Sequence, residues 1–189
     1  MELLTFIDRF LRKYHFIKSE LEWYELFVSM IGALSGMLLI SYLTFKGGYP
    51  MMAPSFGATC VLIYAMPDVP VAQPRNVILG HLNSAIMGVI VSHTFGINWI
   101  SVSFAVTLAI GLMYITDTLH PPGGATALIA ALNGYGVQFI FTPILAGAVL
   151  LVLIAILTNK FSKNCHFASE KIYIRTPLQI IFAKKEKII

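Results

Sequence analysis

The sequence predicts an all-α membrane protein with four long transmembrane helices and two short helices, broken or re-entrant, arranged as two long–short–long repeats. Of the 189 residues, 57% are hydrophobic and only 12% are charged, about half the charged share of an ordinary soluble domain. Residues 1–25 and 160–189 hold nine charges each, whereas the long stretch between them holds only four. This distribution excludes a soluble enzyme, a disordered chain and a nucleic-acid-binding protein.

The charged ends flank a predicted membrane domain at residues 26–159. Residues 1–25 are expected to form an amphipathic helix, which lies either in the membrane interface or against the cytoplasmic base of the protein. Residues 160–189 form a basic tail, which supplies the net charge of +4. Lys and Arg residues before the first span and after the last one predict that both termini are cytoplasmic. We expect a multi-pass protein of the bacterial inner (plasma) membrane.

Four long apolar runs predict the spanning helices. The first has 20 residues without a charge, which corresponds to about 30 Å of helix and suffices to cross a bilayer. Small residues in the runs allow helices to approach closely. The four runs are residues 26–45, 77–95, 97–116 and 137–158.

Two further apolar segments, 50–66 and 120–134, are too short and too irregular to be ordinary spans. Each opens with proline and glycine, which are tolerated in the first turn of a helix, and continues with good helix formers.

The two short segments also resemble each other, because Pro54–Thr59 aligns with Pro121–Thr126 at an offset of 67 residues and both stretches end in Gly-Ala-Thr. We therefore predict that residues 26–95 and 97–158 are internal repeats, a pattern typical of transporters. Either the short segments are re-entrant and the halves run parallel, or the short segments cross the membrane and the halves are inverted.

The irregular starts of the short segments are the candidate substrate-binding site. Irregular backbone inside a bilayer must be buried in protein or line a wet cavity. Free N–H groups and the dipole at a helix start favour a small anion. The alternative is that the glycines serve packing and the threonines bond their own helix backbone. The candidate residues are Ser55, Gly57, Ala58, Thr59, Pro121, Pro122, Gly123, Gly124, Ala125 and Thr126.

Five polar residues are candidates for the pore or its rim: Arg75, His81, Asn83, Asp117 and His120. Arg75 is either a charge at the pore mouth or a topology anchor. His81 lies inside a predicted span, where polar groups seldom face lipid, and serves packing, solute contact or proton relay. Asp117 caps a local turn or pairs with Arg75.

Enzyme chemistry finds no support in the sequence. The only carboxylates at 26–159 are Asp68 and Asp117, each in a predicted loop. No His, Cys and carboxylate cluster has metal-ligand spacing, and no phosphate-binding loop or nucleophile elbow is present. We therefore expect no catalytic residues, no metal and no cofactor.

Three stretches resemble the HPP family of integral membrane proteins. His120–Leu128, with the sequence HPPGGATAL, resembles the signature that gives the family its name. Pro54–Thr59 and Gln73–His81 resemble two other characteristic stretches, in the same order. The resemblance covers residues 26–158 and implies four transmembrane helices. Some relatives in chloroplasts and cyanobacteria are associated with nitrite transport, so the resemblance implies nitrite or a related anion only by analogy.

The sequence thus predicts a transporter or channel for a small monovalent anion, most simply nitrite, bound at the starts of the two short helices. The alternatives are a non-transporting structural or sensor subunit of the membrane and, last, a membrane enzyme. The expected partners are a small inorganic anion and the lipid bilayer, with no nucleic acid. A homo-oligomer is left open.

Overall fold

The computed structural model describes residues 23–162 and 167–168, and this part is helical throughout, without strands. The predicted amphipathic helix and most of the basic tail lie outside the described residues. Six α-helices follow in chain order: α2 (Trp23–Phe45), α3 (Ser55–Cys60), α4 (Pro74–Phe95), α5 (Trp99–Ile115), α6 (Pro121–Asn133) and α7 (Ala146–Asn159). Short helical turns are η1 (Val61–Ala65), η2 (Pro70–Ala72) and η3 (Ile140–Leu145).

Within the described residues, three helices are long and apolar enough to cross a membrane: α2, α4 and the combined stretch of η3 and α7. The fourth predicted span, at 97–116, is shorter than expected. It is α5, whose 17 residues extend over about 25 Å, less than the roughly 30 Å of a hydrocarbon core. Its capping box fixes the start, because the Asn98 side chain accepts from the N–H groups of Ile100 and Ser101. The fourth full-length span therefore stays a prediction.

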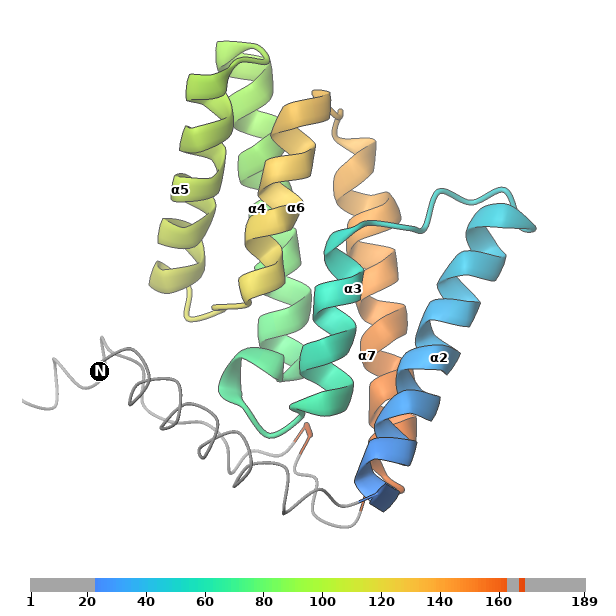
Figure 1. Cartoon of the computed structure of the whole chain (residues 1–189). Coiled ribbons are helices and arrows are strands. Elements are labelled where there is room, and N and C mark those ends of the chain that lie inside the picture. The colour runs from blue at the N-terminus through green and yellow to red at the C-terminus, as the bar shows by residue number, and fades with distance from the viewer. Residues whose placement is uncertain (1–22, 163–166, 169–189) are drawn as a thin grey trace, which may run out of the picture.

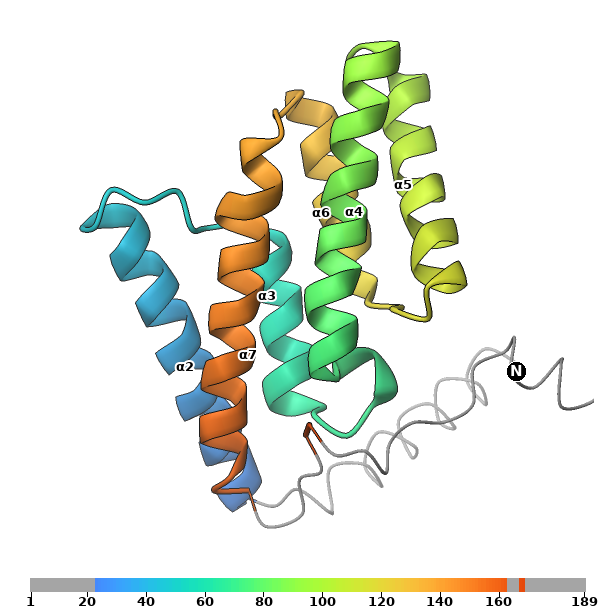
Figure 2. The same cartoon turned by 180° about the vertical axis from the view of Figure 1, so that it is seen from behind.

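The helix directions alternate along the chain (Figures 1 and 2). Helices α2 and α4 run in the same direction, and α5 and α7 run in the opposite direction. Helix α3 returns the chain between α2 and α4, and α6 returns it between α5 and α7. These are the directions of the inverted arrangement, rather than those of re-entrant segments between parallel halves. The start of α2 and the end of α7 lie together, since the Tyr24 hydroxyl donates to the Phe161 carbonyl at 2.8 Å.

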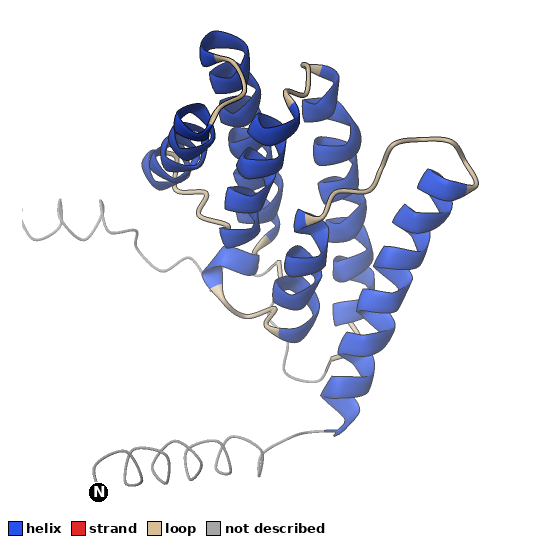
Figure 3. Ribbon diagram, turned by 45° about the horizontal axis from the view of Figure 1, so that its top comes forward, coloured by secondary structure: helices blue, strands red, loops and turns tan. Residues whose placement is uncertain are grey.

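Both short helices begin inside the bundle after irregular stretches, as the Pro-Gly pattern predicts. Residues 46–54 lead from the end of α2 to α3 (Figure 3). The turn at 116–120 leads from α5 to α6, and α6 ends at Gly134, whose φ of 59° is the left-handed conformation that glycine adopts readily. Helix α6 packs against α4 and α5, whereas α3 packs against α6 and α7.

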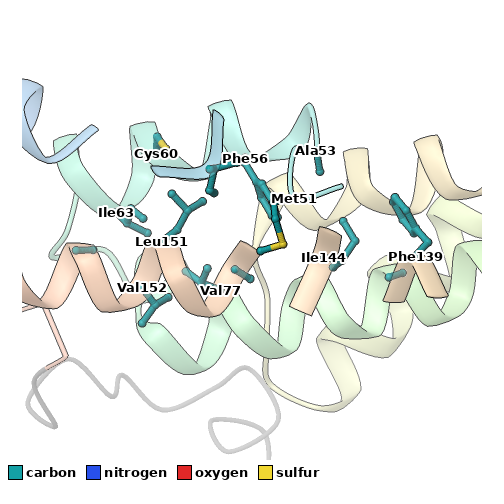
Figure 4. Packing of buried hydrophobic residues seen from close by; sticks show 14 of the residues in the cluster. Met51, Ala53, Phe56, Cys60, Ile63, Val77, Phe139, Ile144, Leu151 and Val152 are labelled. Carbon is teal, nitrogen blue, oxygen red and sulfur yellow. The ribbon is translucent and has the colours of Figure 1, made fainter. Parts of the chain in front are cut away.

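The main hydrophobic core joins α3, α4 and α7 (Figure 4). Phe56, Ile63 and Leu151 are completely buried in it. Phe56 reaches this position because Gly147 of α7 has no side chain: a Cβ at Gly147 would clash with the Phe56 ring. The close contact fixes the start of α3 against α7, which positions the polar residues that follow on α3.

Candidate functional site

The two Gly-Ala-Thr turns meet at a single imidazole. Thr59 of α3 and Thr126 of α6 lie on either side of His81 of α4, and all three side chains are completely buried. Thr59 Oγ1 lies 2.7 Å from His81 Nε2, and Thr126 Oγ1 lies 2.8 Å from His81 Nδ1. One histidine therefore bridges the starts of both short helices, where the sequence predicts the anion site.

Two further residues extend this contact into a continuous hydroxyl–imidazole network, formed by Ser55, Thr59, His81, His120 and Thr126. Ser55 Oγ lies 2.8 Å from Thr126 Oγ1, and His120 Nε2 lies 3.1 Å from Thr59 Oγ1. The two imidazole rings pack edge to face with centroids 4.8 Å apart. None of the five side chains is more than 2% exposed.

Missing side chains at two glycines allow the network to assemble. A Cβ at Gly80 of α4 would lie 2.6 Å from His120 Cβ, and one at Gly123 of α6 would lie 2.6 Å from Ser84 Oγ. Both distances are shorter than carbon and oxygen atoms tolerate, so only glycine lets α4 and α6 approach this closely. The approach brings His120 beside His81.

The threonines also bond their own helices, the alternative that the sequence analysis names. Thr59 Oγ1 lies 3.1 Å from the Ser55 carbonyl oxygen, and Thr126 Oγ1 lies 3.5 Å from that of Pro122. The longer distance makes the second bond weak. These backbone contacts hold the hydroxyl groups in place. They do not use the whole hydrogen-bonding capacity of the hydroxyl groups, because each oxygen also lies within 2.8 Å of a His81 nitrogen.

The glycines and alanines of the two turns face away from the network. A Cβ at Gly57 or Gly124 would meet no atom within 4 Å, and Ala58 and Ala125 are exposed. The ten predicted binding residues therefore divide into two faces. Ser55, Thr59, Pro122, Gly123 and Thr126 point inward, whereas Gly57, Ala58, Pro121, Gly124 and Ala125 border open space.

The free N–H groups expected at the helix starts are mostly taken. Pro121 and Pro122 have no N–H, and the Gly123 N–H donates to the His120 carbonyl at 2.8 Å. At the start of α3, the Phe56 N–H donates to the Ala53 carbonyl at 3.0 Å. Few of the free N–H groups expected at the helix starts are therefore available, because proline removes donors and tight turns use others. Polar capacity at this point comes mainly from side chains.

Three of the predicted pore or rim residues, Arg75, Asn83 and Asp117, form a second polar group around the turn at 116–120. Arg75 Nη1 lies 3.6 Å from Asp117 Oδ2, and Arg75 Nη2 donates to the Thr116 carbonyl at 3.1 Å. Asn83 Nδ2 donates to the hydroxyl groups of Thr116 and Thr118, both at 3.0 Å. Of the two roles considered for Asp117, the structure has the ion pair with Arg75. His120, the last residue of this turn, is the predicted pore or rim residue that links the turn to the network, through its contacts with Thr59 and His81.

Three partners in these groups have no signal in the sequence. The Val71 carbonyl of η2 accepts from His120 Nδ1 at 2.8 Å. Thr116 and Thr118 contact Asn83 from a turn that the apolar pattern marks only as a loop. Contacts across 33 to 49 residues of chain depend on helix packing, which a single sequence does not specify.

A cleft lies beside the start of α3, with a volume of about 390 Å³. Ala53 and Pro54, which directly precede Ser55, form part of its wall, and Tyr135, Gln138 and Thr142 contribute polar groups. The described residues contain no cluster of three or more His, Cys, Asp or Glu side chains that could hold a metal ion. The polar groups at this point are therefore the hydroxyl and imidazole groups of the network, and the network begins at Ser55, the residue that follows Pro54 in the wall of the cleft.

Comparison with known proteins gives a family and two relatives. The family model described as "HPP, transmembrane region" matches residues 18–167. Two Dictyostelium discoideum proteins, each named a transmembrane protein, are 36% identical over 146 residues and 38% identical over 144 residues. The matches cover 71% and 72% of this chain but only 51% and 46% of the relatives, so the chain spans about half the length of the curated relatives it matches. No solved structure matches the chain.

Proposed function

Because this chain belongs to the HPP family, whose matched region is a transmembrane one, we propose that it is a transporter or channel for a small monovalent anion, with nitrite as the first candidate. The family and the apolar helices place it among integral membrane proteins. Nitrite enters only through the association of some family members with nitrite transport. The relatives in Dictyostelium are named simply as transmembrane proteins.

The observation that carries the proposal is the meeting of two interrupted helices at His81. Membrane transporters commonly bind solutes where discontinuous helices of two halves face each other near the midplane. Here Thr59 and Thr126, at equivalent positions of the two short helices, both lie within 2.8 Å of one imidazole. A polar network of this kind between apolar helices costs free energy unless its members are paired, and such groups usually mark a solute or ion pathway.

The chemistry of the network favours an anion. Hydroxyl and imidazole N–H groups donate hydrogen bonds, and no carboxylate contacts the network among the described residues. Asp117 pairs with Arg75 instead. A monovalent anion suits this site better than a divalent one, because a divalent ion loses far more hydration on entering a low-dielectric interior. Solute approaches through the cleft beside Pro54 and through the open space at Gly57 and Gly124.

Uptake into liposomes that contain the purified chain tests the proposal. Initial rates of nitrite and sulfate uptake are compared at equal ionic strength, with protein-free liposomes as the control for leakage. We expect nitrite to enter much faster than in the control vesicles and sulfate to enter at the control rate. Sulfate uptake that matches nitrite uptake would contradict the proposed site, and nitrite uptake no faster than in control vesicles would contradict the function.

A second proposal, a non-transporting structural or sensor subunit, is favoured by one observation. In the described part of the chain, every buried side-chain nitrogen and oxygen atom already has a hydrogen-bond partner, as in a purely structural network. This proposal predicts that nitrite flux stays at the control rate, while substitutions in the network still destabilise the fold. We propose no enzymatic activity for the chain.

A further inference from the structure

We propose that the hydroxyl–imidazole network is a proton-binding relay, and that the anion is carried together with a proton. The coupling to an anion rests on the proposed function. The binding of a proton rests only on the geometry of five side chains and one carbonyl group.

The hydrogens of His120 are fixed by the carbonyl of Val71. A carbonyl oxygen only accepts, so His120 Nδ1, which lies 2.8 Å from it, must carry a hydrogen. In the neutral imidazole, His120 Nε2 is then an acceptor. Its partner in the network is the hydroxyl group of Thr59, at 3.1 Å. Thr59 Oγ1 also lies 3.1 Å from the Ser55 carbonyl oxygen, but Thr59 is the one hydrogen-bond partner of His120 Nε2 among the described residues, so we assign the single Thr59 hydrogen to His120.

The assignment of His81 follows from that of Thr59. His81 Nε2 lies 2.7 Å from Thr59 Oγ1, whose only hydrogen is already used, so Nε2 must itself donate. Neutral His81 then has a bare Nδ1, which accepts from Thr126 at 2.8 Å. In the structure Thr126 Oγ1 is placed as the donor to Ser55 Oγ, 2.8 Å away, so the neutral network requires the Ser55 hydroxyl group to turn and donate to Thr126 instead. In the neutral network, all hydrogens thus point in one direction, from Ser55 to Val71.

One additional proton fits without any movement of the heavy atoms. When His81 Nδ1 is protonated, it donates to Thr126, and Thr126 reverses its hydroxyl group and donates to Ser55. The proton enters at the Ser55 end of the network, because the two residues before Ser55, Ala53 and Pro54, line the cleft. Ser55 receives the proton and gives its own hydrogen to Thr126, which gives its own to His81. Only O–H and N–H bonds break and form, and the network gains one positive charge.

The same step provides a physical link to the anion. In the neutral network, the Ser55 hydrogen is used on Thr126. In the protonated network, Thr126 donates to Ser55, so the Ser55 O–H is released to donate to a solute beside Pro54. The imidazolium of His81 attracts the anion at the same time. Transfer from His81 Nε2 through Thr59 to His120 Nε2 moves the charge toward Val71 and weakens the hold on the anion.

Few other charged groups face the network. The ion pair of Arg75 with Asp117 lies on the neighbouring turn, and Tyr114 is a partly exposed residue of α5. On the α3 side, Cys60 is buried, and the Tyr64 hydroxyl donates to the Leu151 carbonyl at 3.4 Å. The sequences of α6 and α7 contain no Asp, Glu, Lys, Arg, His, Cys or Tyr. The two histidines are thus the basic groups available to a proton within the network.

The deciding experiment measures proton movement with the wild-type chain in liposomes whose membrane potential is clamped by potassium and valinomycin. A pH-sensitive dye inside the vesicles reports proton entry during nitrite uptake, and protein-free vesicles correct for permeation of nitrous acid. We expect proton entry to accompany nitrite, and an acidic exterior to accelerate uptake independently of the potential. Nitrite uptake that is driven by the potential and carries no proton would overturn the relay and leave the proposed function standing.

Matched variants separate the relay from a structural role. Thr126→Val removes the hydroxyl group at nearly constant volume, whereas Thr126→Ser retains it. The readout is the ratio of the uptake rates with and without an acidic exterior, which we expect to fall to the protein-free ratio in Thr126→Val and to stay high in Thr126→Ser. His93→Gln is the control, because His93 lies on the same helix and bonds the Val89 carbonyl of its own turn. An equal ratio in Thr126→Val and wild type would contradict the relay.

A spectroscopic measurement tests proton binding even if no anion is transported. Nitrogen NMR of isotope-labelled histidines distinguishes the two neutral imidazole forms. We expect the hydrogen on Nδ1 in His120 and on Nε2 in His81 at high pH, and the appearance of a doubly protonated ring on acidification while the fold is retained. In a purely structural network, both rings stay neutral until the protein unfolds, and that result would refute proton binding.

Discussion

Two adjacent glycines of α6 should respond oppositely to the same substitution. A Cβ at Gly124 would meet no atom within 4 Å, whereas a Cβ at Gly123 would lie 2.6 Å from Ser84 Oγ and 3.0 Å from the Gly80 carbonyl oxygen. A side chain does not strain the backbone at Gly124, because its φ is not in the left-handed region. Gly124→Leu should therefore fold, and Gly123→Leu should not fit.

The expected difference in stability follows from these contacts. Leucine in place of glycine favours a helix by up to about 0.8 kcal/mol, less in the first turn. Forcing a side chain into the packed contact at Gly123 costs roughly 1–3 kcal/mol or more. The propensity gain is common to both variants, so they should differ by the packing cost of about 1–3 kcal/mol, or roughly 2–12 °C in apparent unfolding temperature for a chain of this size.

The assay is thermal unfolding in detergent at one scan rate, since membrane proteins often unfold irreversibly, followed by nitrite uptake. Gly124→Leu should match the wild type in stability but lose most uptake, because its side chain fills the open space at the start of α6. Equal stability of the two variants would refute the packing argument. Full uptake by Gly124→Leu would refute a solute path at this turn.

Three further outcomes are expected. Arg75→Gln should reduce uptake modestly, and more at low salt than at high salt, while Asp117→Asn should increase uptake. The two charges offset each other at 3.6 Å, and exposed charges are screened over about 10 Å at 0.1 M salt. Equal responses at both salt concentrations would contradict electrostatic attraction of the anion by Arg75. Gly147→Leu should lower the apparent unfolding temperature, since its side chain collides with Phe56; an unchanged temperature would contradict the core packing. Ser55→Ala should lower nitrite uptake more at acidic than at neutral pH, measured as a pH profile, because it removes the hydroxyl group that protonation releases; a parallel pH profile would contradict that role.

Hydrophobic patterning predicts the helices well because apolar runs in a membrane protein directly reflect the bilayer. The runs at 26–45 and 77–95 fall within α2 and α4. The run at 137–158 is kinked inside η3, where Thr142 has a non-helical backbone conformation beside Pro143. The run at 97–116 gives a helix of only 17 residues, because Asn98 caps its start and the chain turns at Thr116. Apolar length alone overestimates this element.

The candidate site is predicted in part, since composition shows which residues are unusual in a membrane but not which atoms they meet. His81 is identified as an intramembrane polar residue, yet its contacts with Thr59 and Thr126 cross 22 and 45 residues of chain. The prediction of free N–H donors fails because Pro121 and Pro122 mark a helix start and also remove its donors. The sequence allows Asp117 either to cap a local turn or to pair with Arg75. The ion pair forms because α4, which carries Arg75, packs against the turn at 116–120. The internal repeat stays a prediction.

Counterflow tests the central claim most directly, because it requires a binding site that is accessible from both sides and needs no gradient of pH or potential. Liposomes that contain the chain are loaded with unlabelled nitrite and diluted into a trace of isotope-labelled nitrite. The account predicts that label enters faster than into protein-free vesicles and, where the site works as a carrier, accumulates transiently above its external concentration. This accumulation is abolished when the interior holds sulfate instead of nitrite. Label that only equilibrates, at the same rate as in protein-free vesicles, would contradict a carrier or channel site where the two short helices meet.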